Sequence, residues 1–285
     1  MKFATYNSNA KTHYGAVNDG GMIALDPLFP EWPTLYDVVR NGGLGALEDA
    51  AKGASVTHKN FEYDMVLPNA RRILCVGVNF PKRNAEYKDD SAAPKYMSLF
   101  VRFPSSLTGH DQPLIRPAEN HTLDYEGEVA IVIGRTGRRI STQEAYDYIS
   151  ALTISNEGTI RDWVRHAKFN VTQGKNWDRS GALGPWLVPF KDATQLDEAR
   201  IITRVNGEVR QNDTLNRMVF SVRDIIAYVS TFMTLEPGDV IITGTPTGAG
   251  ARFDPPRYLI PGDEVEVEVS GLGTCLLYTS DAADE

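Results

Sequence analysis

Apolar residues along the chain fall mainly into short runs that are separated by turn-forming residues. These runs predict β-strands at residues 73–78, 129–134, 201–206, 240–243 and 265–269. The last run alternates valine with glutamate, which is typical of a strand with one buried and one solvated face. Pro-Gly-Asp turns that begin at Pro237 and Pro261 each lead directly into a strand. The chain is therefore expected to be rich in β-structure.

Other segments predict helices, at residues 34–39, 44–51, 142–152 and 221–233. The last of these has apolar residues at helical spacing and begins with Ser221 and Asp224, the signature of a capping box. The regular alternation of strand and helix that a doubly wound sheet requires is missing. We therefore expect an α+β, β-rich fold built as a mixed β-sandwich or β-roll.

Turn-forming residues are frequent up to residue 68, which predicts a small N-terminal domain over 1–68 and a catalytic domain over 70–275. With 285 residues and a hydrophobic fraction of 42%, the chain can bury an enzyme-sized core. One of its two cysteines, Cys75, lies inside an apolar run. Neither a disulfide framework nor a thiolate metal site is therefore expected.

The net charge of −8 argues against a nucleic-acid partner, because lysine and arginine never form a run. No segment has the length and hydrophobicity of a signal peptide or of a membrane span. The sequence thus predicts a cytoplasmic protein with no membrane partner.

Two glutamates, Glu126 and Glu128, stand just before the apolar run 129–134 with only Gly127 between them. Residues two apart on a strand share one face, so the two carboxylates are expected to lie close together. Such a pair repels unless one carboxylate is protonated or a cation lies between them, and a cation is the simpler solution. By itself, however, the triplet also fits a solvated acidic strand end.

A third carboxylate, Glu157, follows the helix and strand predicted over 145–155 and makes a cation site the better interpretation. Ligands that are all oxygen favour Mg²⁺ or Mn²⁺, with Ca²⁺ as a further candidate. Zn²⁺ is disfavoured, because it would be expected to recruit histidine or cysteine.

A series of short motifs extends over residues 73–273. In chain order they are CVGVNF at 75–80, DYEGE at 124–128, RD at 161–162, KNWD at 175–178, GPW at 184–186, VNGE at 205–208, LEPGDVI at 235–241 and GTPTG at 244–248. This order resembles the fumarylacetoacetate hydrolase family. The resemblance implies the mixed β-sandwich roll of that family, a homodimer, and a metal-dependent enzyme that acts on a small 2-oxo or enol carboxylic acid.

The resemblance also implies roles for single residues. Glu126, Glu128 and Glu157 would hold the metal, Lys175 and Glu86 would be catalytic, and substrate contacts would come from Arg102, Gln211 and Thr245. The cation would polarise the oxo group of a chelated 2-oxo acid, and Lys175 would help to hold the negative charge of the enolate. Hydrolysis of a carbon–carbon bond in an acylpyruvate-type substrate is the first expectation.

Two positions depart from the family pattern. Glu157 stands where the family usually has the shorter aspartate, which moves the carboxylate outward by about one bond. Arg83 stands where hydrolytic members carry the histidine that pairs with Glu86 to activate water. Arginine stays protonated and cannot be that general base, so Arg83 is instead a candidate to bind a second substrate carboxylate. Isomerase, tautomerase or decarboxylase chemistry on a 2-oxo dicarboxylic acid is therefore the alternative.

Three other interpretations fit less well. His110 or His166 could replace the missing base, although a lone histidine is more often structural. The glycine-rich loop 244–250 could cradle a phosphate, but it lacks the Lys-Ser/Thr pair of a P-loop, and prolines follow it where a helix should begin. A metal-binding homologue without catalysis is the third and is harder to dismiss, because Arg83 in place of the histidine fits it.

Residues 276–285 also depart from the pattern, because the family continues a strand after residue 273. We interpret this segment as a tail that is not native to the gene and leave it out of the expected fold.

Overall fold

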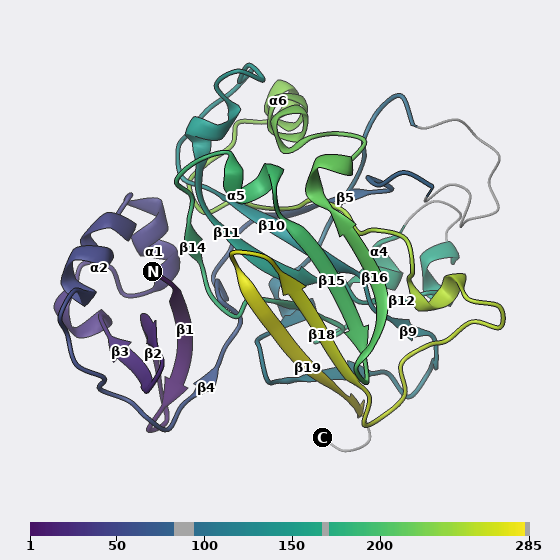
Figure 1. Cartoon of the computed structure of the whole chain (residues 1–285), viewed down its shortest axis with the longest axis horizontal. Coiled ribbons are helices and arrows are strands. Elements are labelled where there is room, and N and C mark those ends of the chain that lie inside the picture. Colours follow the sequence, from purple (N-terminus) through teal and green to yellow (C-terminus); the bar gives the residue numbers. More distant parts are fainter. Residues whose placement is uncertain (83–93, 167–170, 283–285) are drawn as a thin grey trace.

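The computed structural model describes residues 1–82, 94–166 and 171–282 (Figure 1). Arg83 and Glu86, two residues named from the sequence, lie outside the described residues. Two large sheets form the body of the molecule, and a smaller sheet with helices lies at its side. No helix among the described residues is long and apolar enough to cross a membrane.

The central sheet joins strands from segments that are far apart in the chain. In spatial order it consists of β6 (Ser98–Val101), β5 (Ile73–Gly77), β17 (Val240–Ile242), β10 (Gly127–Ile133), β11 (Ile149–Asn156), β13 (Gly181–Leu183) and β7 (Leu107–Thr108), with β14 (Val188–Pro189) also paired to β11. Strand β17 pairs in parallel with β5 and antiparallel with β10, so the sheet is mixed.

The second sheet consists of β16 (Glu208–Thr214), β15 (Arg200–Val205), β18 (Glu264–Val269), β19 (Gly273–Asp281) and β8 (Pro113–Arg116). A two-stranded ribbon of β9 (Leu123–Asp124) and β12 (Thr159–Ile160) completes the body. All five strands predicted from the sequence are present as β5, β10, β15, β17 and β18, which confirms those predictions.

Strand β10 is buried on both faces and lies between two cores. Its residues Val129, Ile131 and Ile133 pack in one core, which also contains Ile201 and Val267 of the second sheet. The intervening Ala130 and Val132 belong to the other core, on the opposite face. Burial on both faces explains why this segment is a continuous apolar run rather than an alternating one. It also places the start of β10, with its two glutamates, deep inside the body.

The N-terminal part is a four-stranded sheet covered by short helices. It consists of β1 (Phe3–Ser8), β2 (Lys11–Asn18), β3 (Gly21–Ala24), β4 (Glu62–Tyr63), the 3-10 turn η1 (Asp26–Leu28), α1 (Leu35–Arg40) and α2 (Leu44–Ala51). Both predicted helices, 34–39 and 44–51, are thereby confirmed.

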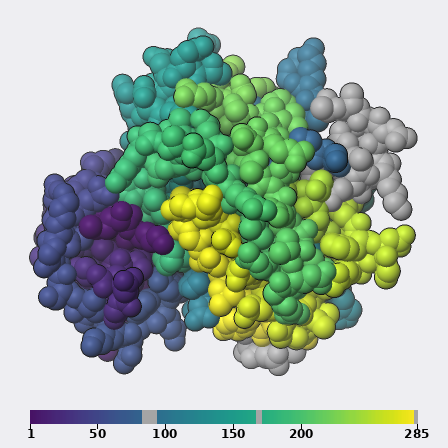
Figure 2. All heavy atoms as spheres, viewed as in Figure 1, coloured from purple at the N-terminus to yellow at the C-terminus, as the bar shows by residue number. Residues whose placement is uncertain are grey.

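This N-terminal part shares a core with the body. Leu35 and Leu47 of its helices lie in the same apolar cluster as Ile73 and Val240 of the central sheet. Phe3 also exchanges two backbone hydrogen bonds with Leu187, of 2.9 and 2.7 Å. Figure 2 shows the N-terminal residues, in purple and blue, packed directly against the body. The domain boundary at 68–70 therefore stays a prediction, since one core crosses it.

The remaining helical segments within the described residues are short, apart from one. They are η2 (Pro104–Ser106), η3 (Ala145–Tyr148), η4 (Asp162–Arg165), α4 (Thr172–Lys175), α5 (Thr194–Asp197), η5 (Leu215–Arg217), α6 (Val222–Phe232) and η6 (Gly250–Arg252). Helix α6 confirms the prediction for 221–233, including the capping box of Ser221 and Asp224.

The predicted helix at 142–152 is wrong. Only the 3-10 turn η3 forms there, and from Ile149 the chain is the strand β11. β11 pairs antiparallel with β10 along its whole length, and its residues Leu152 and Ile154 enter the core. Pairing with a buried neighbour strand has overridden the helical spacing of the apolar residues.

The expectation that residues 276–285 take no part in the fold is wrong up to Asp281. Strand β19 pairs antiparallel with β18 and parallel with β8, and it buries Cys275 and Leu277. Alternation of buried and outward-facing residues allows this segment to serve as a strand. The non-native origin of the tail stays a prediction.

The cap of helix α6 gives a testable prediction. The Ser221 side chain accepts a hydrogen bond from the backbone N–H of Asp224 at 3.2 Å and donates one to the Asp224 carboxylate at 2.6 Å. Ser221→Ala is therefore expected to lower the free energy of unfolding by about 0.5–2 kcal/mol in urea denaturation. Ser55→Ala, at an exposed loop serine, is the matched control and should be neutral. Equal stability of the two variants would contradict the prediction.

Candidate active site

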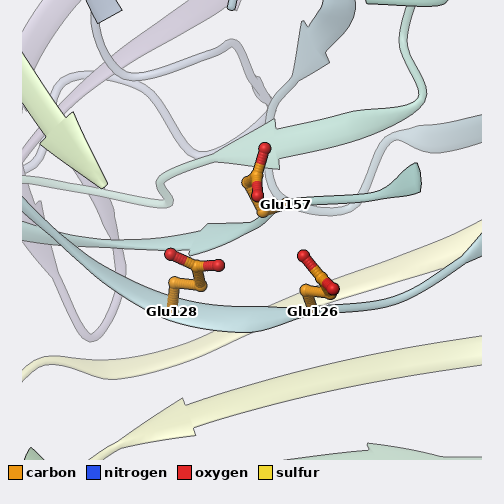
Figure 3. Close-up of side chains that lie close together, drawn as sticks. All are labelled: Glu126, Glu128 and Glu157. Carbon is orange, nitrogen blue, oxygen red and sulfur yellow. The ribbon is translucent and has the colours of Figure 1, made fainter. Parts of the chain in front are cut away.

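Three glutamates converge on one point, as the sequence predicts. Glu126 and Glu128 flank Gly127 at the start of β10, and Glu157 directly follows the neighbouring strand β11. One carboxylate oxygen from each lies within 4.8 Å of the others (Figure 3). Exposure of these residues is only 4%, 1% and 2%, so the cluster is buried.

The pairing of β10 with β11 creates this convergence. Gly127 lies opposite Asn156 in the antiparallel register, which brings Glu157 next to Glu126. The backbone N–H of Glu157 donates to the Glu126 carbonyl at 2.7 Å, and the Asn156 side chain accepts from the Glu126 N–H at 3.0 Å. Glu157 thus reaches the cluster.

Lys175 is a buried cation between two of these carboxylates. Its Nζ atom donates hydrogen bonds of 2.7 Å to both Glu126 and Glu157 from the end of the short helix α4. Burial lowers the pKa of Lys175, but the carboxylates of Glu126 and Glu157 outweigh burial and raise that pKa above its ordinary value. The lysine is therefore held in its charged form.

Arg161 is a second cation of the site. No role for this arginine was expected from the sequence. Its Nη2 donates to Glu126 at 2.8 Å and its Nε to Asp124 at 2.7 Å. The fully buried Asp124 also accepts hydrogen bonds from the backbone N–H groups of Gly250 and Ala251. The only signal in the sequence was the RD motif at 161–162, which carries no information on the partner of the arginine.

The electrostatics favour an additional cation. Burial raises the pKa of Glu128 well above its ordinary value, and Glu157 and Glu126 add to this effect. Burial also raises the pKa of Glu157, whose Oε1 atom has no hydrogen-bond partner. The trio is the only candidate metal cluster in the described part of the chain, and its donors are all carboxylate oxygens. This donor set fits a hard divalent cation such as Mg²⁺ or Mn²⁺.

A cavity of about 110 Å³ opens onto the cluster. Besides the three glutamates, Lys175 and Arg161, its walls include the residues Val76, Ser98, Phe100, Val164 and Thr245. The volume is far below the roughly 300–1,000 Å³ of pockets that hold drug-sized ligands. The space therefore suits a small ligand.

The three substrate contacts implied by resemblance lie in different places. Thr245 lines the cavity. Arg102 lies behind Glu157, fully buried, and donates to Gly158, Ser106 and Ser180. Gln211 is also buried and bonds to residues of the site rather than lining the cavity.

Neither candidate histidine lines the cavity. His110 accepts a hydrogen bond from the Leu276 N–H and packs against Tyr63, whereas the exposed His166 lies on Trp163, with ring centroids 4.3 Å apart. In the glycine-rich loop, the amides of Gly244 and Gly250 donate to Glu128 and Asp124. These amides are therefore engaged by carboxylates of the site, which disfavours a phosphate cradle.

Comparison with known proteins gives consistent matches. The family model of the fumarylacetoacetate hydrolase C-terminal domain matches residues 72–276. An oxaloacetate tautomerase of Bacillus subtilis (strain 168) is 38% identical over 208 residues, which cover 72% of this chain and 68% of that protein. A mitochondrial oxaloacetate tautomerase of Homo sapiens is 34% identical over 265 residues, which cover 91% and 84%.

A solved structure agrees with these matches. Fumarylacetoacetate hydrolase from the psychrophile Exiguobacterium antarcticum has a TM-score of 0.86 and 31% identity, and the similarity covers 99% of both chains. The family resemblance, the β-rich fold and the assignment as an enzyme are thus confirmed. The chain belongs to the fumarylacetoacetate hydrolase family.

Proposed function

We propose that the protein is a divalent-metal-dependent tautomerase of a small 2-oxo dicarboxylic acid such as oxaloacetate. The observation that carries the proposal is the buried trio of carboxylates, with Lys175 between two of them, on a cavity of about 110 Å³. Both sequence relatives reported above are named oxaloacetate tautomerases, which supports this substrate.

Each part of the cavity has a use in this reaction. Glu126, Glu128 and Glu157 would hold Mg²⁺ or Mn²⁺, which when bound polarises the 2-oxo group of the substrate. Lys175 and Arg161 lie beside the cluster and supply positive charge for a dicarboxylate. The small volume excludes substrates with a long chain or a large ring.

Lys175 acts as a fixed positive charge rather than as a base. The neighbouring carboxylates raise its pKa, which favours the ammonium form. The ammonium group can instead stabilise the negative charge that develops on the enolate oxygen.

Tautomerisation is better supported than the carbon–carbon hydrolysis that was the first expectation. It moves one proton between carbon 3 and the oxygen on carbon 2 and consumes no water. Hydrolysis needs a base for an attacking water, and in the sequence Arg83 stands at the position of the histidine that would provide one. The named activity of the sequence relatives points the same way. A homodimer and a cytoplasmic location stay predictions.

Metal removal tests the proposal directly. Protein stripped with a chelator is expected to accelerate oxaloacetate tautomerisation only after Mg²⁺ or Mn²⁺ is added, measured as loss of enol absorbance above the rate without protein. Glu128→Gln removes one ligand charge and should raise the metal concentration needed by at least about tenfold. Glu264→Gln, at an exposed glutamate of β18, is the matched control and should behave like the wild type.

Activity that survives chelation would contradict the proposal that the three carboxylates hold a catalytic metal. Product analysis with an acylpyruvate separates the two chemistries, since metal-dependent release of pyruvate would identify a hydrolase that uses another base. Carbon dioxide from oxaloacetate would identify a decarboxylase.

Replacement of the buried lysine tests its role as a charge. Lys175→Met is expected to lower kcat by about 10²–10³-fold, because a cation aimed at the developing enolate is lost. In the metal-free protein the same change leaves Glu126 and Glu157 without their shared partner, so the Tm should fall and added Mn²⁺ should raise it more than in the wild type. Lys191→Met, at an exposed lysine, is the control. An unchanged kcat for Lys175→Met would rule out the assigned role.

A further inference from the structure

We infer that Gln211 and Thr245 form a clamp on Gly127 that sets the spacing between the metal ligands Glu126 and Glu128. Gln211 accepts a hydrogen bond from the Gly127 N–H at 2.9 Å, and Thr245 donates one to the Gly127 carbonyl at 2.9 Å. The two side chains are also bonded to each other, from Gln211 Nε2 to Thr245 Oγ1 at 2.8 Å. Both polar backbone groups of the residue between the ligands are therefore held by one closed ring.

The position of these bonds gives the clamp its effect. The N–H of Gly127 belongs to the peptide unit shared with Glu126, and its carbonyl belongs to the unit shared with Glu128. Fixing both units fixes the backbone from which the two carboxylates extend. Without such bonds a glycine has more backbone freedom than any other residue. The distance between the carboxylates of Glu126 and Glu128 would then vary more.

A residue other than glycine would not fit between the two ligands. A Cβ atom at position 127 would lie 2.1 Å from the hydroxyl of Thr203, a buried residue of β15 in the second sheet. Close approach of the second sheet thus requires glycine, and the clamp removes the freedom that glycine brings. Gln211 comes from the same sheet, directly opposite Thr203 in the pairing of β15 with β16.

The bonding of Gln211 differs from that of a substrate contact. Its side chain is 1% exposed, and its amide nitrogen donates to both Thr245 and the Pro246 carbonyl, at 2.8 Å each. An amide has two N–H groups, so its donor capacity is used within the protein. Gln211 is therefore a positioning residue that acts on the metal through Gly127, and Thr245 acts in the same way through its hydroxyl.

The inference rests on the proposed use of a metal, and Mn²⁺ affinity tests it without reference to turnover. Mn²⁺ would be titrated into chelator-stripped full-length protein and its binding followed by electron paramagnetic resonance. Gln211→Ala is expected to weaken Mn²⁺ binding by about 10- to 100-fold, as loss of partners that orient metal ligands commonly does. At saturating Mn²⁺ its KM for oxaloacetate should stay near the wild-type value.

Two further variants and a control separate positioning from a general loss of stability. Thr245→Val keeps the shape of the side chain and removes the hydroxyl, so it should also weaken Mn²⁺ binding, whereas Thr245→Ser keeps the hydroxyl and should restore it. Gln195→Ala is the matched control, because Gln195 also ties a loop together through three amide hydrogen bonds, to residues 189, 191 and 192, but lies outside the site. Its Mn²⁺ affinity should equal that of the wild type.

Several outcomes would overturn the inference. Wild-type Mn²⁺ affinity in both Gln211→Ala and Thr245→Val, with a raised KM at saturating Mn²⁺, would make the two residues substrate contacts instead. A wild-type protein that binds no Mn²⁺ would overturn the clamp together with the metal site. Failure of the proposed function looks different, because the wild type would then bind Mn²⁺ with a clamp-dependent affinity and yet not tautomerise oxaloacetate.

Discussion

Mutual repulsion of three buried carboxylates is the constraint on which the rest of the site depends. Glu126, Glu128 and Glu157 bring oxygens within 4.8 Å of one another in a region shielded from water, where like charges are costly. Removing one partner from a buried ion pair costs about 3–5 kcal/mol, so each carboxylate must keep its neighbours. Lys175 and Arg161 bond directly to the trio, and Arg102 lies 3.5 Å from Glu157. The buried carboxylates therefore depend on these cations remaining in place.

The two arginines are in turn fixed by groups that do not line the cavity. The fully buried Asp124 orients Arg161 and ties it to the turn at 250–251. Ser106 and Ser180 hold the guanidinium of Arg102 in its place behind Glu157. With Asp124 included, four carboxylates face three cations among the described residues, so negative charge is in excess. An excess of this kind attracts a divalent cation, whereas a further lysine or arginine would fill the small cavity.

Sequence patterns predicted five of the strands and the proximity of Glu126 and Glu128 well, because both depend on local spacing. Valine and glutamate alternate along β18, and the Glu-Gly-Glu triplet places two carboxylates on one side of the chain. The segment 142–152 was mistaken for a helix because its apolar spacing fits both structures, and only pairing with β10 decides between them. The clamp on Gly127 and the bond from Asp124 to Arg161 join residues 34 to 118 positions apart. No local pattern encodes such contacts. For this reason Gln211 was expected at the site only through the family resemblance, and no role was predicted for Arg161.

Under the proposed function, the same charge arrangement would stabilise an enolate. An enolate forms when the substrate loses a proton next to its oxo group, and the negative charge then lies on an oxygen. Lys175, whose charge is held by Glu126 and Glu157, is already in place to stabilise that oxygen, so little rearrangement is needed as the charge develops. Tautomerisation needs an acceptor for the proton of carbon 3, and hydrolysis needs, in addition, an attacking water that a base activates. Lys175 and Arg161 can stabilise the anion but do not accept the carbon proton, so another group must do so; the preference for a tautomerase rests on its having no need for an activated water.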